Sequence, residues 1–203
     1  GMLRTFGIFA LTLVGSLPLG MIVALLRKSR ISIVRGIIRI YISVIRGTPL
    51  MLQLLVWYFG PYYLFGWAIR DWRFPAILVG FILNYAAYFA EIYRGGISSM
   101  PIGQYEAADV LGYSKFQTFI HIILPQVIKR IMPSITNEIV TLVKDTSLAF
   151  AVSYQEMFTI GKQIANSQTS FVPFLVAGLF YYVFNFLVDF VMGLLEKRLN
   201  YYR

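Results

Sequence analysis

Long apolar runs alternate with short basic or polar stretches along the whole chain. Five of these runs reach about 20 residues or more, which is enough for a helix to cross a hydrocarbon core of about 30 Å. The pattern therefore predicts an all-α membrane protein with five transmembrane helices, in a single domain over residues 1–203. The expected spans cover residues 5–26, 40–65, 74–97, 122–150 and 171–195.

The second run contains two places where a helix should be interrupted. Residues 47–49 read Gly-Thr-Pro and residues 60–61 read Gly-Pro. Proline removes a backbone donor and clashes with the preceding turn, so we expect a kink or break at each place. Ahead of this run, Arg35 and Arg39 are four residues apart and share one helical face. They predict an interfacial helix over residues 31–46 that leads into the second span.

The composition agrees with a chain whose solvent is mostly lipid. Hydrophobic residues make up 58% of the sequence and charged residues only 13%, whereas a soluble domain has about a quarter of its residues charged. The mean hydropathy is +0.69. The net charge of +9 comes from basic residues between apolar runs, so membrane topology explains it better than nucleic-acid binding. The chain has no cysteine and hence no disulfide or thiolate metal site.

The distribution of basic residues orients the expected bundle. Thirteen of them would lie on one side of the membrane and five on the other. The positive-inside rule makes the richer side cytoplasmic, which places the N-terminus outside and the C-terminus inside. The cytoplasmic set is Arg27, Lys28, Arg30, Arg35, Arg39, Arg46, Arg94, Lys115, Lys129, Arg130, Lys197, Arg198 and Arg203, and the other set is Arg4, Arg70, Arg73, Lys144 and Lys162.

The loop over residues 99–125 is polar and carries helix start and stop signals. Ser99 is a suitable N-cap and Pro101 suits a first turn, so a short helix is expected over residues 102–111. Gly112 then ends this helix in a left-handed conformation. Residues 114–117 have the Ser-x-x-Gln pattern of a capping box, which predicts the start of a second helix.

The short helix has a face that suits contact with another protein. Glu106 and Asp109 are three residues apart and share that face, while Tyr105 and Leu111 add apolar contact area. A helix of this kind at the membrane surface can insert into a groove on a partner. A solvated connector is the alternative that the residues leave open.

An ordered spacing in this loop resembles a known motif. The residues are Glu106-Ala107-Ala108, Gly112 four positions later, Ile122, and Leu124-Pro125. This spacing resembles the EAA loop of ABC importer permeases. The resemblance implies that Glu106, Ala107, Ala108, Asp109 and Gly112 belong to the coupling helix that docks on an ATP-binding subunit.

Further segments resemble the polar amino-acid branch of that family, and most closely its arginine, lysine and histidine permeases. They imply a permease subunit that translocates polar, basic amino acids by alternating access in an ATP-driven importer. The matching segments are Arg46-Gly47-Thr48-Pro49-Leu50, Gln53, Ala90-Glu91, Arg94-Gly95-Gly96-Ile97, Gly103-Gln104, Leu124-Pro125-Gln126, Asn137-Glu138 and Lys144-Asp145-Thr146-Ser147-Leu148.

The resemblance implies a division of labour among subunits. The chain has no G-x-x-x-x-G-K-[ST] phosphate-binding motif, and His121 is its only histidine. We therefore expect no catalytic residue, metal or cofactor on this chain, with ATP and Mg²⁺ bound by two partner ATPase subunits. The other implied partners are a second permease copy as a homodimer, an extracytoplasmic substrate-binding protein, an amino-acid substrate and membrane lipid, in the bacterial inner membrane.

Charged residues deep in a span point to the substrate site, because each costs about 2.5–3.5 kcal/mol at a helix centre. Glu138 and Asp145 lie seven residues apart in the fourth span and project from nearly the same face. Carboxylates beside aromatic rings suit a cationic side chain, and backbone N–H groups over residues 145–148 would suit an α-carboxylate. The expected substrate-binding residues are Asn84, Tyr85, Glu138, Thr141, Asp145 and Ser147.

Structural roles for the same charges remain open at this point. Glu91 could pair with Arg94 one turn later, and Asp145 could pair with Lys144 or Lys162 or cap the next turn. Glu138 could be neutralised by Lys144 or by a group of the partner subunit, and Asn84 could make only an interhelical hydrogen bond. Two other classes of protein also remain open. An ion-coupled secondary transporter would use the buried carboxylates without any ATPase, and a membrane scaffold would bind no substrate.

Overall fold

The computed structural model describes residues 1–67 and 70–199, and these contain helices but no β-strand. A π-helical turn over Thr118–Ile123 joins α6 to α7, and a 3₁₀ helix over Thr146–Val152 follows α7. The α-helices are α1 (Met2–Arg27), α2 (Ser32–Gly47), α3 (Leu50–Phe65), α4 (Arg73–Ser98), α5 (Ile102–Val110), α6 (Lys115–Gln117), α7 (Leu124–Asp145), α8 (Met157–Gln168) and α9 (Val172–Leu199). Arg203, which the sequence assigned to the cytoplasmic side, lies outside the described residues.

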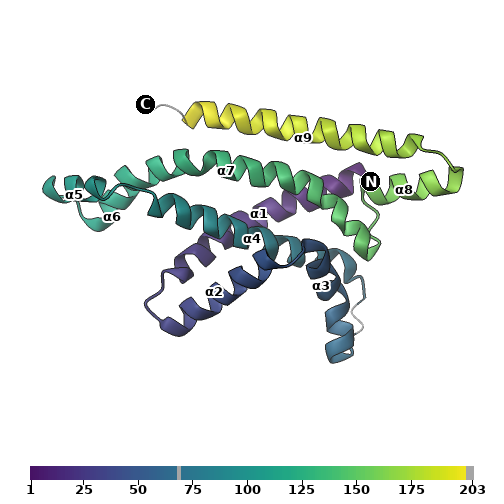
Figure 1. Ribbon diagram of the computed structural model, residues 1–203, viewed down its shortest axis with the longest axis horizontal. Coiled ribbons are helices and arrows are strands. Elements are labelled where there is room, and N and C mark those ends of the chain that lie inside the picture. The colour runs from purple at the N-terminus through teal and green to yellow at the C-terminus, as the bar shows by residue number, and fades with distance from the viewer. Residues whose placement is uncertain (68–69, 200–203) are drawn as a thin grey trace.

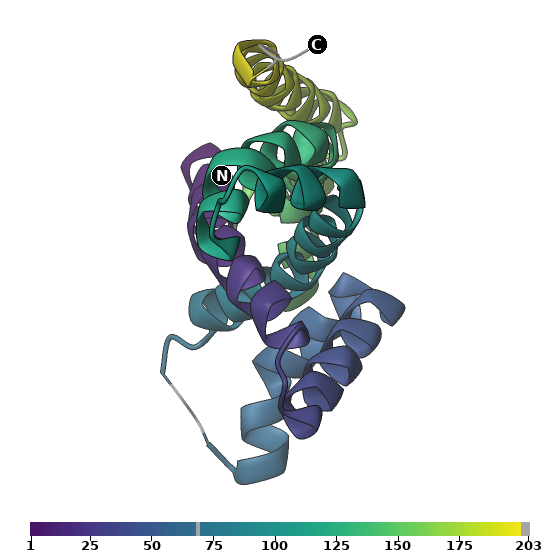
Figure 2. The same ribbon diagram turned by 90° about the vertical axis from the view of Figure 1, so that its left-hand side faces the viewer.

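Helices α1, α4 and α7 form the centre of the molecule. α1 packs along α4, and α7 packs on both α4 and α9. Figures 1 and 2 show α9 along one side of this centre and the pair α2 and α3 on the opposite side. α5 and α6 project from one end of the long axis, and α8 lies at the other end.

Close packing makes α4 the central helix of the fold. A Cβ atom at Gly20 of α1 would lie 2.8 Å from the Cβ of Phe89 and 3.2 Å from the carbonyl oxygen of Ala86, so a side chain has no room there. Small residues of this kind let two membrane helices approach closely. Phe81 and Tyr85 of α4 are also almost fully buried. α4 is therefore a rigid platform for the polar side chains that it carries.

Among the described residues, three helices are long and apolar enough to span a membrane, namely α1, α4 and α9. α2 and α3 together would form a fourth, broken span, with 112° between the two helices. α7 takes the place of the expected span over residues 122–150. Its charged side chains, which include Lys129, Arg130 and Glu138, keep its hydropathy below that of the other spans. Five spans, and the orientation derived from charge, stay predictions.

The second span differs from its expected form. The sequence placed its start at residue 40, which lies inside α2, and predicted two interruptions. The helix breaks at Thr48 and Pro49, and α3 continues through Pro61 to Phe65. Pro61 leaves the carbonyl of Trp57 without its backbone donor. The indole Nε1 of Trp72 donates to that carbonyl at 2.9 Å, so the helix tolerates the proline.

The loop between α4 and α7 largely follows the sequence prediction. α5 ends at Val110, and Gly112 has the left-handed conformation with φ of +77°. The capping box is confirmed, since the Ser114 hydroxyl accepts from the Gln117 backbone N–H and the Gln117 side chain accepts from the Ser114 N–H. The prediction for Ser99 was wrong. Ser99 ends α4 as its C-cap, where its hydroxyl donates to a carbonyl of the last turn.

Candidate functional site

A polar pocket of about 300 Å³ lies where the break between α2 and α3 meets α4 and α7. The break contributes extended backbone, while α4 and α7 each present one polar face. The pocket is lined by Thr48, Pro49, Leu50, Asn84, Tyr85, Tyr88, Glu138, Thr141 and Asp145. Five of the six residues that the sequence proposed for substrate binding therefore surround one cavity.

Helical spacing explains why these side chains converge. Glu138, Thr141 and Asp145 are three and four residues apart on α7 and so lie on one face. Asn84 and Tyr88 are four residues apart on α4 and face the cavity in the same way. The two faces meet because α4 and α7 pack against each other.

The Asp145 carboxylate is held by a side chain from α4. The Tyr85 hydroxyl donates to Asp145 Oδ2 at 2.7 Å, and Tyr85 itself is only 2% exposed. Neither lysine alternative is realised. Among the described residues no ion pair involves Asp145, and Lys162 lies over the ring of Phe150 at 5.5 Å. The capping alternative also fails, because the backbone continues from α7 into the 3₁₀ helix without a side-chain cap.

Glu138 has a different environment. Its side chain is half-buried at the pocket, and within the described part of the chain its carboxylate has no hydrogen bond or ion pair. A carboxylate in a membrane helix needs a partner to offset its loss of hydration. Glu138 therefore offers an unmatched acceptor for a donor that enters the pocket.

Two of the sequence-predicted residues are engaged elsewhere in whole or in part. The Asn84 amide nitrogen donates to Gln53 Oε1 at 2.9 Å, which leaves its oxygen at the pocket. The Ser147 hydroxyl donates to the carbonyl of Lys144, and Ser147 does not line the cavity. The residues of the helix break were missing from the predicted set. The Gly-Thr-Pro break was visible in the sequence, although its distance from the carboxylates was not.

Glu91 belongs to an arginine cluster and not to the pocket. Its carboxylate accepts from Arg94 at 2.9 Å, as one sequence alternative proposed, and it also pairs with Arg27 and, at 3.7 Å, with Arg46. The Arg46 guanidinium lies 5.2 Å from the ring centre of Tyr88. The cluster therefore lies next to the pocket, one turn further along α4.

The short helix α5 presents an exposed surface at one end of the molecule (Figure 1). Ala108 is buried and attaches α5 to the bundle, whereas Glu106 and Asp109 are exposed. Val110 is 88% exposed and Leu111 is also exposed. An apolar and acidic surface on a projecting helix is suited to bind another protein.

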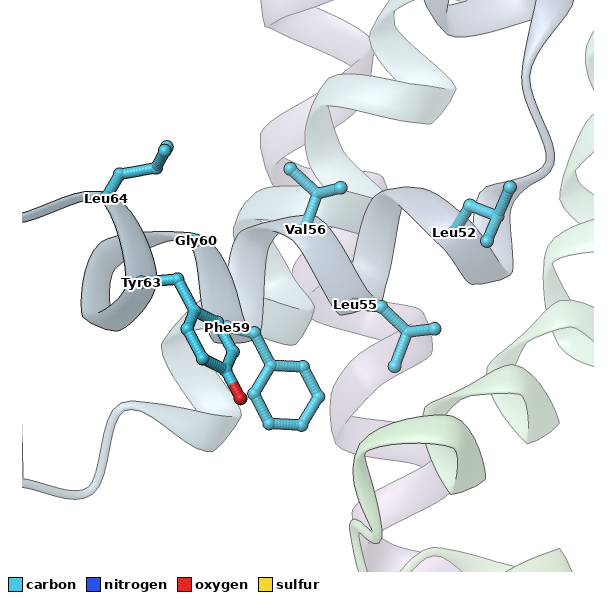
Figure 3. A pocket seen from close by; sticks show the side chains of 7 residues that line it. All are labelled: Leu52, Leu55, Val56, Phe59, Gly60, Tyr63 and Leu64. Atoms are coloured by element: carbon cyan, nitrogen blue, oxygen red, sulfur yellow. The ribbon is translucent and has the colours of Figure 1, made fainter.

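A larger hollow of about 550 Å³ is a poor site for a polar solute. All of its lining residues come from α3, and apart from the Tyr63 hydroxyl their side chains present only aliphatic and aromatic carbon (Figure 3). Such a surface suits lipid chains or an apolar helix. Its lining residues are Leu52, Leu55, Val56, Phe59, Gly60, Tyr63 and Leu64.

A broken membrane helix, a pocket with two carboxylates and a projecting surface helix together define a solute-translocating membrane subunit. The family model described as the binding-protein-dependent transport system inner membrane component matches residues 16–201. The chain belongs to this family, which supplies the membrane-embedded permease of ABC transporters and not their ATPase.

Similar proteins include both curated relatives and a solved structure. The putative glutamine transport system permease GlnP of Rickettsia bellii is 35% identical over 98% of this chain and 91% of its own length. The arginine transport system permease ArtQ of Bacillus subtilis is 34% identical over the same shares. A crystal structure of an amino acid ABC transporter with histidines superposes with a TM-score of 0.89 at 31% identity, over 98% of this chain and 92% of that chain. The names of these two relatives, which are similarly identical to this chain, thus refer to a neutral amino acid, glutamine, and to a cationic one, arginine.

Proposed function

We propose that this chain is the permease subunit of an ATP-driven importer for polar amino acids, with a preference for the cationic side chains of arginine, lysine and histidine. The observation that carries the preference is the pocket itself. It brings the carboxylates of Glu138 and Asp145 together, and no lysine or arginine is among its described lining residues. A cationic side chain would bring a positive charge into the pocket and would supply donors to Glu138, which has none among the described residues. The rings of Tyr85 and Tyr88 would contact its stem or its guanidinium plane.

The helix break offers a place for the other end of an amino acid. The sequence suggested backbone N–H groups over residues 145–148 for the α-carboxylate, but the chain there continues as a 3₁₀ helix. α3 instead begins at Leu50, which lines the pocket, and the first turn of a helix has backbone N–H groups without helical partners. The positive end of a half-helix is a favourable site for an anion. We assign the α-carboxylate to this end.

The energy for transport would enter through α5. The exposed face of α5 would dock on a partner ATPase that binds ATP and Mg²⁺, and closure of two ATPases would move two permease copies between inward-open and outward-open states. Such a shift requires the closed ATPase pair to bind one of these states more tightly than the other. An extracytoplasmic binding protein would deliver the amino acid, and the complex would lie in the bacterial inner membrane as one homodimer with two ATPases. An ion-coupled secondary transporter is not favoured, because the family depends on binding proteins.

Binding measurements on the purified permease–ATPase complex test the preference. Glu138→Gln keeps the shape of the side chain and removes its charge. A charge-assisted hydrogen bond contributes about 1.5–3 kcal/mol, so the affinity for arginine should fall about tenfold or more. The affinity for glutamine, whose side chain is neutral, should change much less. An equal loss of affinity for both amino acids would overturn the cationic preference. Gln163→Leu, on the exposed face of α8 and away from the pocket, is the control and should leave both affinities unchanged.

A further inference from the structure

The break between α2 and α3 leaves backbone carbonyls without their helical donors. In a continuous helix the N–H of residue 49 would donate to the carbonyl of Ile45, but Pro49 has no N–H. Thr48 is extended, with φ of −124° and ψ of 147°, so its own carbonyl also leaves the helical pattern. Inside a membrane no water is present to satisfy such groups, and irregular backbone persists only where protein groups or a wet cavity do so.

The Gln53 side chain supplies the missing donors. Its Nε2 donates to the carbonyl of Ile45 at 2.8 Å and to that of Thr48 at 3.1 Å, and it lies 2.9 Å from the Thr48 hydroxyl. The Thr48 hydroxyl in turn donates to the carbonyl of Val44 at 2.8 Å. Two side chains therefore replace the backbone bonds that the break removes. Gln53 is 8% exposed, so solvent cannot easily take over its role.

Asn84 fixes the orientation of this amide. Its Nδ2 donates to Gln53 Oε1 at 2.9 Å, and Asn84 is 5% exposed. Carbonyl oxygens only accept, so the Gln53 nitrogen must face the break while its oxygen faces Asn84. The break in the second span is thereby tied to α4, the central helix of the fold, at a residue that lines the pocket.

We propose that Gln53 is a positioning residue for the substrate pocket. Without touching the substrate, it holds the break in the geometry that places Thr48, Pro49 and Leu50 on the pocket wall. It also keeps α3 as a separate half-helix whose first turn can face the substrate. This inference rests on the proposed function, because it assumes that the pocket binds an amino acid.

A pair of substitutions separates this role from general stabilisation. Gln53→Leu removes the amide, whereas Pro49→Ala restores the backbone N–H that Ile45 lacks. The single Gln53→Leu variant should lose affinity for arginine about tenfold or more, or fail to assemble. The Gln53→Leu, Pro49→Ala double variant should assemble, since a continuous helix satisfies the Ile45 carbonyl, yet bind arginine as weakly as Gln53→Leu or more weakly. Gln163→Leu on the exposed face of α8 makes the same change of side chain away from the pocket, and it should assemble and bind arginine as wild type does.

The measurements are assembly of the intact permease–ATPase complex, equilibrium binding of arginine, and arginine-stimulated ATPase activity. For assembled variants we expect a higher arginine concentration for half-maximal stimulation with an unchanged maximal rate. Unchanged affinity in Gln53→Leu would overturn the proposal. A double variant that regains wild-type affinity would also overturn it, because Gln53 would then only supply a donor to the Ile45 carbonyl and would not position the pocket wall. A double variant that does not assemble would overturn it too, because a backbone donor to that carbonyl would then not replace Gln53. If wild type binds no amino acid, the proposed function fails, and that result is distinct from all of these.

Discussion

The arginine cluster around Glu91 allows a quantitative prediction. Glu91 is the only carboxylate in an ion pair with Arg27, Arg46 and Arg94 among the described residues, and its side chain is 15% exposed. The substitution Glu91→Gln keeps the side-chain shape but leaves three guanidinium groups close together without a counter-charge. Two unit charges 4 Å apart interact by about 4 kcal/mol at an effective dielectric constant of 20. Repulsion between two neighbouring arginines should therefore lower the free energy of unfolding.

The expected loss can be estimated from the exposure of the arginines. Removal of one partner from a buried ion pair costs about 3–5 kcal/mol. The arginine side chains here are 24% to 43% exposed, and hydration offsets part of the repulsion, so we expect the low end, about 3 kcal/mol. For a chain of this size that is a fall in Tm of roughly 6–12 °C.

Thermal unfolding of the purified complex in lipid nanodiscs measures this effect. Asp71→Asn is a matched control, because it also removes one negative charge from an ion pair. Asp71 and Arg70 are both more than 90% exposed and 3.8 Å apart, so that pair should contribute less than about 1 kcal/mol. Adding Arg94→Gln to Glu91→Gln should recover part of the Tm by removing one repelling charge. A Glu91→Gln variant as stable as Asp71→Asn, or a double variant less stable than the single one, would refute this reasoning.

Two further predictions concern the ends of the molecule. Glu106→Arg combined with Gly112→Pro should abolish amino-acid-stimulated ATPase activity and leave arginine binding intact, since proline cannot adopt the positive φ of Gly112; retained stimulation would contradict docking through α5. Glu156 is fully buried and accepts four hydrogen bonds, from the backbone N–H groups of Phe158 and Thr159 and from the hydroxyls of Thr159 and Tyr181. Glu156→Gln turns one acceptor into a donor that faces these donor groups, so we expect the free energy of unfolding to fall by about 2–4 kcal/mol. An unchanged Tm in thermal unfolding would contradict this expectation.

Much of the fold was predictable because it depends on short stretches of sequence. The helical character of the apolar runs follows from length and hydropathy, and Gly112 with the box at Ser114 follows from contacts within four residues. The ordered spacing after Glu106, which carries the resemblance to ABC importer permeases, also lies within one short stretch of sequence. Local sequence signals misplaced Ser99, because Ser99 could either end one helix or begin the next, and the length of α4 decided between them.

The residues of the pocket were predicted as a set without their individual roles. Periodicity along one helix placed Glu138 and Asp145 on a common face. It could not show that Asp145 accepts from Tyr85, which is 60 residues earlier, or that Glu91 is engaged with arginines from three helices. Such contacts depend on how helices pack, and no local pattern encodes that packing.

The two prolines of the second span separate what the sequence determines from what the tertiary structure determines. The sequence alone determines that Pro49 and Pro61 each remove a backbone donor. The tertiary structure determines which side chain replaces it, namely Gln53 at the break and Trp72 within the continuous helix α3. In a membrane every carbonyl needs a donor from the protein or from a wet cavity. The position of those distant donors, fixed by helix packing, decides whether a proline bends the chain into a pocket wall or lies in an ordinary helix.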